Sequence, residues 1–238
     1  MNSNRKTAII VGVLFIIATV SLFAESFYKP ILSSPDYLDI IYPNKIIVII
    51  GILLESIMIP AMFLIPIFLF PILKKHNKVL ALGYIGFRSL EAVLISIAEI
   101  NKLSLVNLSR DYLNKGGVDV SYFQNIGSSI QSKLYLVNTD GLIYVAIFAI
   151  GALILYSILY QSKLVPRWIA GWGFIAAITI LIGSMLSAFT DISPVITILL
   201  IAPIAAQEMV FAVWLIVKGF NPSAIDSGSA KTELNEIK

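Results

Sequence analysis

Six long stretches of almost uninterrupted apolar residues divide the chain. A helix needs about 20 predominantly apolar residues to cross a hydrocarbon core of about 30 Å, so each stretch is long enough to span a membrane. The apolar runs are continuous rather than alternating, which disfavours the strands of a membrane β-barrel. The pattern therefore predicts an all-α polytopic membrane protein, a six-helix bundle with spans at about residues 7–23, 46–73, 79–100, 141–160, 168–189 and 195–217.

The polar stretches between the spans complete the predicted organisation. The longest one, residues 102–140, is expected to form a long extracytoplasmic loop between the third and fourth helices. Apolar residues recur there at roughly helical spacing from Val118 to Leu134, which indicates a helix packed on the bundle or lying on the membrane surface. Residues 1–220 then form one transmembrane domain, and residues 221–238 form a polar cytoplasmic tail.

The amino-acid composition disfavours several classes of function. The chain is 58% hydrophobic and only 13% charged, whereas soluble domains carry about 25% charged residues, so soluble enzymes and nucleic-acid-binding proteins are disfavoured. It has no cysteine and one histidine, His76, which excludes disulfides, thiolate chemistry and two-histidine metal motifs. No GxSxG or P-loop motif occurs. We expect no cofactor, no metal site and no nucleic-acid partner; the lipid bilayer is the expected surrounding.

Positive charges predict the orientation. Short loops on the cytoplasmic side of membrane proteins are enriched in Lys and Arg. The clearest such loop here is Lys74-Lys75-His76-Asn77-Lys78, between the second and third spans. Arg5, Lys6, Lys163, Arg167 and Lys218 fall on the same side when the six spans are threaded through a bilayer. We therefore expect a multi-pass protein of the cell membrane with both termini in the cytoplasm.

The third span carries three ionisable residues, Arg88, Glu91 and Glu99. At 100° per residue they lie within an arc of about 80°, which places them on one stripe of the helix. An ionisable side chain in the bilayer centre costs at least about 2.5–3.5 kcal/mol on insertion scales, so this stripe should face protein or water.

Two other spans carry polar groups at similar depth. Arg88 and Glu91 lie about 14 and 18 Å from the inner end of the third span, and Glu208 about 14 Å from the inner end of the sixth, next to Gln207. Glu55 of the second span is expected near the same level.

One arginine then faces three carboxylates, so one carboxylate should be protonated, hydrated or paired with an imported cation. The candidate ligand-binding residues are Arg88, Glu91, Glu208, Gln207 and Glu55.

Three segments carry a resemblance to a known family. They are Gly86-Phe87-Arg88 followed by Glu91, then Pro166-Arg167-Trp168-Ile169-Ala170-Gly171-Trp172-Gly173, and Pro203 with Gln207-Glu208 running into residues 212–220. Together with the six spans, they make the chain resemble a bacterial membrane family, the DUF4386 domain of unknown function. The resemblance implies an integral membrane protein and supplies no catalytic assignment.

Three functional hypotheses follow. The leading one is a non-enzymatic bundle with a buried Arg/Glu site that binds or moves a small ligand, a lipid headgroup or a proton. The second is an intramembrane enzyme that uses Glu91 or Glu208 as general acid or base. The third is a structural or regulatory subunit of a membrane complex, in which the buried charges only fix helix packing. The pattern leaves the oligomeric state open.

Overall fold

The described part of the chain is built from helices. The computed structural model describes residues 3–190 and 193–227, and within these ranges it contains no strand. The helices are α1 (Ser3–Leu22), α2 (Glu25–Leu32), α3 (Tyr37–Ile40), α4 (Lys45–Ser56), α5 (Met58–Leu73), α6 (Lys78–Asn114), α7 (Val120–Val137), α8 (Leu142–Ser162), α9 (Arg167–Ser187) and α10 (Pro194–Val217).

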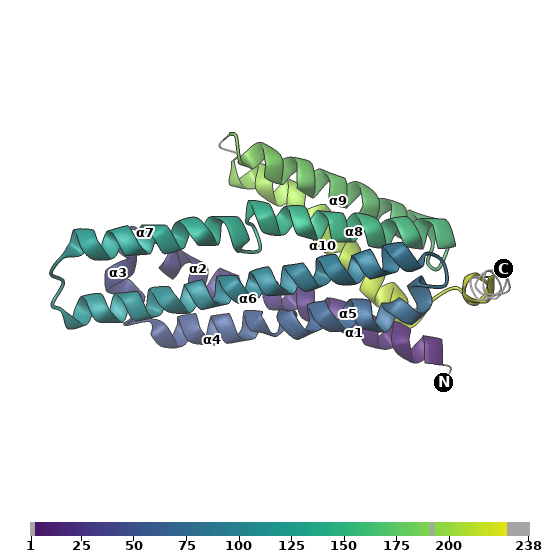
Figure 1. Cartoon of the computed structure of the whole chain (residues 1–238), viewed down its shortest axis with the longest axis horizontal. Helices are drawn as coiled ribbons and strands as arrows, with labels where there is room; N and C mark the ends of the chain where they lie inside the picture. Colours follow the sequence, from purple (N-terminus) through teal and green to yellow (C-terminus); the bar gives the residue numbers. More distant parts are fainter. Residues whose placement is uncertain (1–2, 191–192, 228–238) are drawn as a thin grey trace.

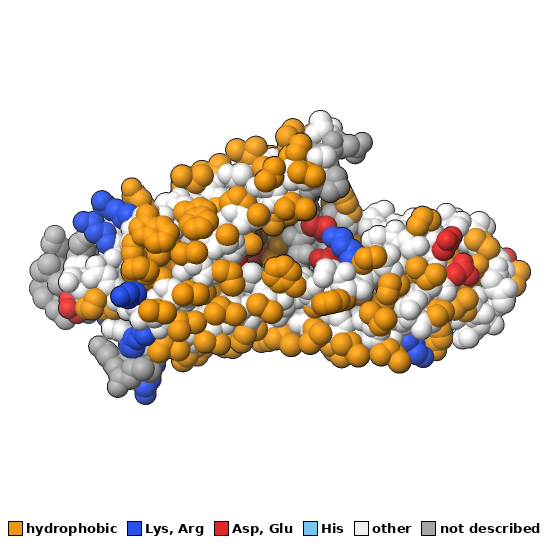
Figure 2. Space-filling view, turned by 180° about the vertical axis from the view of Figure 1, so that it is seen from behind, with side chains coloured by type: hydrophobic (Ala, Val, Ile, Leu, Met, Phe, Trp, Pro, Cys, Tyr) orange, Lys and Arg blue, Asp and Glu red, His pale blue; other side chains and the backbone are white. Residues whose placement is uncertain are grey.

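Six helical segments are long and apolar enough to cross a membrane, which confirms the predicted six-helix membrane bundle. They contain α1, the α4–α5 pair, α6, α8, α9 and α10. Large apolar side chains cover most of the flank of the molecule, as Figure 2 shows, and this is the surface that an acyl environment requires. The protein is therefore a multi-pass membrane protein.

The six spanning helices form a closed ring. α1 packs against α5 and α10, α6 packs against α5 and α8, and α9 packs against α8 and α10. The start of α1 and the end of α10 lie at one end of the elongated molecule (Figure 1), which we call the terminal end; the opposite end is the distal end. A ring of this kind encloses an interior lined by one face of each helix, and that interior is the place to look for polar groups.

The distal end carries a further small assembly, which we call the distal cap. It consists of α2, α3, the first half of α4, the part of α6 beyond residue 100, and α7, which lies beside α6 (Figure 1). The cap has its own apolar core, in which Tyr28, Ile41, Leu105 and Phe123 are buried. The connection expected as a loop over residues 102–140 is thus largely helical, because α6 continues to Asn114 and α7 covers residues 120–137.

Specific polar contacts fix several helix ends. The Asn77 side chain accepts a hydrogen bond from the Leu80 amide and caps the start of α6. Arg5 of α1 donates to the carbonyl oxygens of Leu215 (3.0 Å) and Val217 (3.2 Å), which satisfies the C-terminal end of α10. After α10, residues 222–227 are helical and bury Ala224 and Ile225; residues 228–238 of the predicted polar tail lie outside the described residues.

Gly12 allows α1 and α10 to approach each other closely, and this contact can be tested. A methyl group on Gly12 would lie 2.7 Å from the carbonyl oxygen of Ala212, whereas one on Gly86 would meet nothing within 4 Å. We expect Gly12→Ala to lower the free energy of unfolding by about 1–3 kcal/mol through overpacking. Gly86→Ala should leave it unchanged or raise it, since alanine favours helix. Thermal unfolding in detergent measures both; equal stability of the two variants would contradict the close packing.

Candidate functional site

Arg88 and Glu91 form a buried ion pair on the inner face of α6. One guanidinium nitrogen of Arg88 lies 2.8 Å from Glu91 Oε2, and the two residues are 5% and 0% exposed. Their spacing of three residues places both side chains on the same helix face, as the sequence predicted. Arg88 Nε and Glu91 Oε1 are buried without a hydrogen-bond partner. The charge of Arg88 is therefore neutralised within its own helix.

Glu208 of α10 is placed differently. Its Oε2 accepts a hydrogen bond of 3.4 Å from Thr19 of α1, and it has no Lys or Arg nitrogen within 4.0 Å in the described part of the chain. Glu208 and Arg88 both line a cavity of about 100 Å³ inside the helix ring, which we call the ring cavity. Its other walls are mostly apolar, with Phe15, Met62 and Phe148 among them. The surface seen in Figure 2 is hollowed beside the distal cap, with acidic and basic side chains near the hollow.

Aromatic side chains fill the ring on the terminal side of this cavity. Tyr84 precedes Arg88 by about one helical turn, Phe211 follows Glu208 by about one turn, and both are almost completely buried. The rings of Tyr156 and Phe15 pack edge-to-face against Phe211. The ring interior is therefore closed toward the terminal end, while the cavity extends toward Thr139, in the connection between α7 and α8 where the ring meets the distal cap.

Gln207 lies outside the ring cavity. Its Oε1 accepts a hydrogen bond from the Tyr156 hydroxyl (2.6 Å) and its Nε2 donates to the Ile169 carbonyl (3.1 Å). Both ends of the amide are used to join α10 to α8 and α9. Gln207 therefore has a structural role in this arrangement, although the sequence placed it among the candidate ligand-binding residues.

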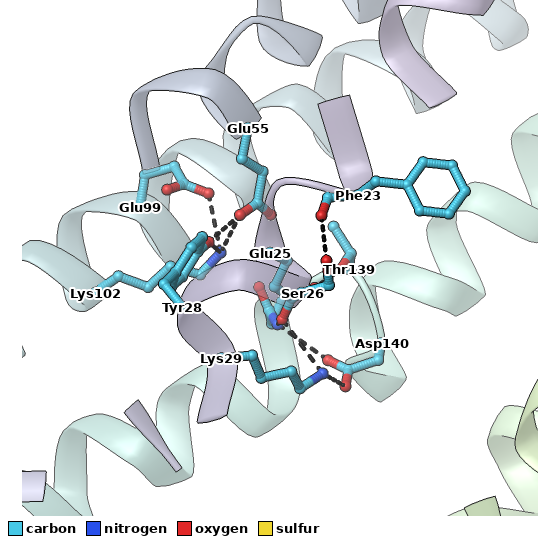
Figure 3. Close-up of polar contacts among 11 residues, drawn as sticks. Phe23, Glu25, Ser26, Tyr28, Lys29, Glu55, Glu99, Lys102, Thr139 and Asp140 are labelled. Atoms are coloured by element: carbon cyan, nitrogen blue, oxygen red, sulfur yellow. Dashed lines mark hydrogen bonds and ion pairs between the residues drawn. The ribbon is translucent and has the colours of Figure 1, made fainter. Parts of the chain in front are cut away.

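Glu55 does not meet Arg88; this expectation from the sequence was wrong. Glu55 instead lies 2.9 Å from Lys102 Nζ and accepts a hydrogen bond from the Tyr28 hydroxyl. Lys102 also contacts Glu99 Oε1 (3.1 Å) and donates to Tyr28 (2.9 Å). These four residues, from α2, α4 and α6, form the distal cluster, and Figure 3 shows them pointing toward one another. Each of them is at most 5% exposed.

A third polar network lies at the rim of the distal cluster. Lys29 is 2.7 Å from Asp140 and 3.3 Å from Glu25 (Figure 3). Glu25 also accepts hydrogen bonds from Asn138 (2.8 Å) and Thr139 (3.1 Å). A cavity of about 330 Å³, the distal cavity, is bounded by residues of this network and by Lys102 and Tyr28.

The sequence analysis did not identify Lys102 and Tyr28 as members of a buried site. Lys102 falls in the loop expected over residues 102–140, because the third span is expected to end near residue 100. The signal that could have found it is the spacing of Glu99 and Lys102, which are three residues apart and so share one face of a helix.

The chemistry available in these clusters is that of carboxylates and fixed cations. Among the described residues there is no group of three or more His, Cys, Asp or Glu side chains arranged to hold a metal ion. Among the described residues, the ring cavity has one carboxylate on its wall, Glu208, because Glu91 points to Arg88 and is not part of the lining. A single carboxylate that faces a mostly apolar cavity can bind a positive charge or exchange a proton.

Comparison with known proteins gives one match. A family model described as "Domain of unknown function (DUF4386)" matches residues 10–219, which include most of α1, the other five spanning segments and both buried clusters. No curated protein and no solved structure matches the chain.

Two isosteric substitutions test the assignment of the charges. Glu91→Gln leaves Arg88 buried without its ion-pair partner, so we expect a loss of about 3–5 kcal/mol in the free energy of unfolding. Glu208→Gln removes a carboxylate whose hydrogen bond in this arrangement comes from Thr19, so the loss should be about 1 kcal/mol or less. Chemical denaturation of both variants in detergent checks this. A larger loss for Glu208→Gln than for Glu91→Gln would show that Arg88 depends on Glu208 instead.

Proposed function

The chain belongs to the DUF4386 family, and we propose that this protein binds a small, partly apolar ligand through a positively charged group in the ring cavity. The observation that carries the proposal is the position of Glu208. It is the one carboxylate on the wall of this cavity, and no cation in the described residues lies within 4.0 Å of it. A carboxylate in an apolar surrounding requires a positive partner or a proton.

The balance of charges around Arg88 also supports a positively charged ligand. The arginine is already neutralised by Glu91 at 2.8 Å, so the ring cavity as a whole has an excess of one negative charge when both carboxylates are ionised. A ligand with an ammonium group would restore neutrality at Glu208, while its apolar part would contact Phe15, Met62 and Phe148. A lipid amine headgroup and a small organic amine share this chemistry.

The ring cavity is closed on one side and extends toward the other, and this shape supports movement of a ligand across part of the membrane. The aromatic layer of Tyr84, Tyr156 and Phe211 closes the ring toward the terminal end, and the cavity reaches Thr139 near the distal cap. This is the arrangement of a carrier that is open to one side and closed to the other. The ligand would therefore enter from the distal end.

The charge distribution supports an orientation in which the terminal end is cytoplasmic. Basic side chains gather at that end of the molecule, as Figure 2 shows. Lys74, Lys75 and Lys163 lie in short connections there, and Arg167 begins α9 directly after one of them; basic short connections of this kind remain on the cytoplasmic side. The distal cap would then lie on the outer side of the cell membrane.

The ligand class can be tested with n-butylammonium and n-butanol, which have the same chain length and differ in charge. At ten times its Kd, n-butylammonium should raise the free energy of unfolding of the wild type by about 1.4 kcal/mol. The effect should disappear in Glu208→Gln and remain in Asp39→Asn, which removes an exposed carboxylate of the distal cap. Equal stabilisation by n-butanol, or retention of the effect in Glu208→Gln, would contradict a cation site at Glu208.

Access and orientation can be tested together because the chain has no cysteine. Ala205 lines the ring cavity, whereas Ala177 of α9 is fully buried away from it at a similar distance from the terminal end. We expect Ala205→Cys to react with a membrane-impermeant cationic methanethiosulfonate added to intact cells, and Ala177→Cys to remain unlabelled. Labelling of Ala205→Cys only in inside-out vesicles would reverse the orientation. Labelling from neither side would exclude access to the ring cavity.

A further inference from the structure

The distal cluster has more negative than positive charge. Lys102 carries its one positive charge, and Glu55 and Glu99 carry two negative charges when both are ionised. The Lys102 ammonium group has three hydrogen atoms, and three oxygens receive them: Tyr28 Oη, Glu55 Oε2 and Glu99 Oε1, at 2.9, 2.9 and 3.1 Å. All three ammonium hydrogens of Lys102 are therefore engaged, and its single positive charge cannot neutralise the second carboxylate.

Two carboxylate oxygens of the cluster have no partner. Glu55 Oε1 and Glu99 Oε2 are buried and accept no hydrogen bond. Glu55 is 0% and Glu99 is 5% exposed, so bulk water does not screen the excess charge. A buried negative charge without a partner is strongly unfavourable, and a carboxylate in this position takes up a proton.

The hydrogen bonds favour the ionised form of Glu55 over that of Glu99. Glu55 Oε2 accepts from both Lys102 and the Tyr28 hydroxyl, and these donors stabilise its ionised form. Glu99 has one donor, Lys102, at the longer distance of 3.1 Å. We propose that the distal cluster is a second binding site of the protein and that its ligand is a single exchangeable proton carried by Glu99.

The neighbouring charged groups favour the same state. Glu25 and Lys29 of α2 and Asp140 of the connection between α7 and α8 line the distal cavity beside the cluster. Lys29 and Asp140 point toward each other (Figure 3). Tyr135 of α7 is the remaining titratable group on the wall of the distal cavity. Lys29 pairs with two carboxylates, Glu25 and Asp140, so this network also has an excess of one negative charge. Its field adds to the tendency of Glu99 to remain protonated.

The distal cavity supplies the route for exchange. Tyr28 and Lys102 form part of the wall of this cavity, which has a volume of about 330 Å³. Asp140 and Lys29 form another part of the wall, and their side chains are about half exposed. Water in this space can carry a proton between the solvent at the distal end and the cluster. The proton site is therefore reached without passing through the ring cavity, and it does not depend on the function proposed for Glu208.

The proton also links the packing of the distal cap to pH. Tyr28 belongs to α2 and Glu55 to α4, and both are held by Lys102 of α6. When the cap opens and the cluster becomes hydrated, Glu99 releases its proton, so the closed cap binds one proton more than the open cap. The closed cap is then favoured at low pH and loses stability as pH rises. Over the interval in which only the closed state retains the proton, the opening equilibrium should increase about tenfold per pH unit.

Infrared difference spectroscopy of the full chain in detergent tests the site directly. The wild type should show the C=O absorption of a protonated carboxyl group that weakens as pH rises and shifts in D₂O. Glu99→Gln keeps an acceptor for Lys102 and has no proton to lose, so one component of this absorption should be absent. Asp111→Asn, on the same helix and more than half exposed, is the matched control and should keep the complete absorption. An unchanged protonated-carboxyl absorption in Glu99→Gln would overturn the proposal.

Hydrogen–deuterium exchange of α2 and α4 provides the second measurement. After correction for the intrinsic exchange rate, the opening equilibrium of these helices in the wild type should rise with pH by about tenfold per unit. In Glu99→Gln this slope should be lost, and in Asp111→Asn it should be retained. A slope in Glu99→Gln equal to that of the wild type would overturn the proposal even if the variant is less stable. Glu208→Gln should keep the slope, which distinguishes failure of the proton site from failure of the ring-cavity site.

Discussion

A charge buried inside an apolar bundle has to be paired, and α6 meets this requirement twice along one face. Arg88 pairs with Glu91, and Lys102 pairs with Glu99, in each case at a spacing of three residues. The two arrangements are 11 residues apart, which is close to three full helical turns, so they face the same interior. A second carboxylate from another helix accompanies each pair: Glu55 of α4 contacts Lys102, and Glu208 of α10 lines the ring cavity together with Arg88. Both sites therefore contain one cation and two carboxylates, and the helix ring and the distal cap are assembled around them.

The two sites differ in how the second carboxylate is held. Glu55 is drawn in to 2.9 Å of Lys102 and is further bound by Tyr28, so the distal cluster is closed and its excess charge can be removed only by a proton. Glu208 lies beyond 4.0 Å from any cation in the described chain and faces a cavity, so a larger ligand can reach it. Under our two proposals, the same balance of one cation and two carboxylates binds two different ligands. The space beside the second carboxylate decides which ligand each site takes.

The sequence predicted which segments form spanning helices better than it predicted how neighbouring helices are offset along the bundle. Continuous apolar runs predicted six spans, and the angular positions of Arg88 and Glu91 placed both on the interior face. The expected depth of Glu55 was wrong because it requires the second and third spans to end at the same level on the outer side. The Tyr42 amide donates to Ser109 Oγ, so the start of α4 lies level with a point on α6 far beyond residue 100. Because α6 continues to Asn114, Lys102 lies on a helix inside the protein and not in the expected loop. Hydropathy reports the length of an apolar helix, and the offset between neighbouring helices is set by tertiary contacts such as this one.

Glu25 and Thr139 connect the two sites physically. Thr139 lines the ring cavity together with Arg88 and Glu208, and its hydroxyl donates to Glu25, which lines the distal cavity together with Lys102. The linings of the two cavities are therefore linked by the hydrogen bond between these two side chains. Glu25 is in turn held by Lys29, which also pairs with Asp140 across the rim. On the proposed route from the distal end, a ligand passes Thr139, and any displacement of Glu25 in that step changes the field at Glu99. Because electrostatic interactions in an apolar interior are weakly screened, such a displacement would alter how strongly Glu99 holds its proton, although the proton site itself is separate from Glu208.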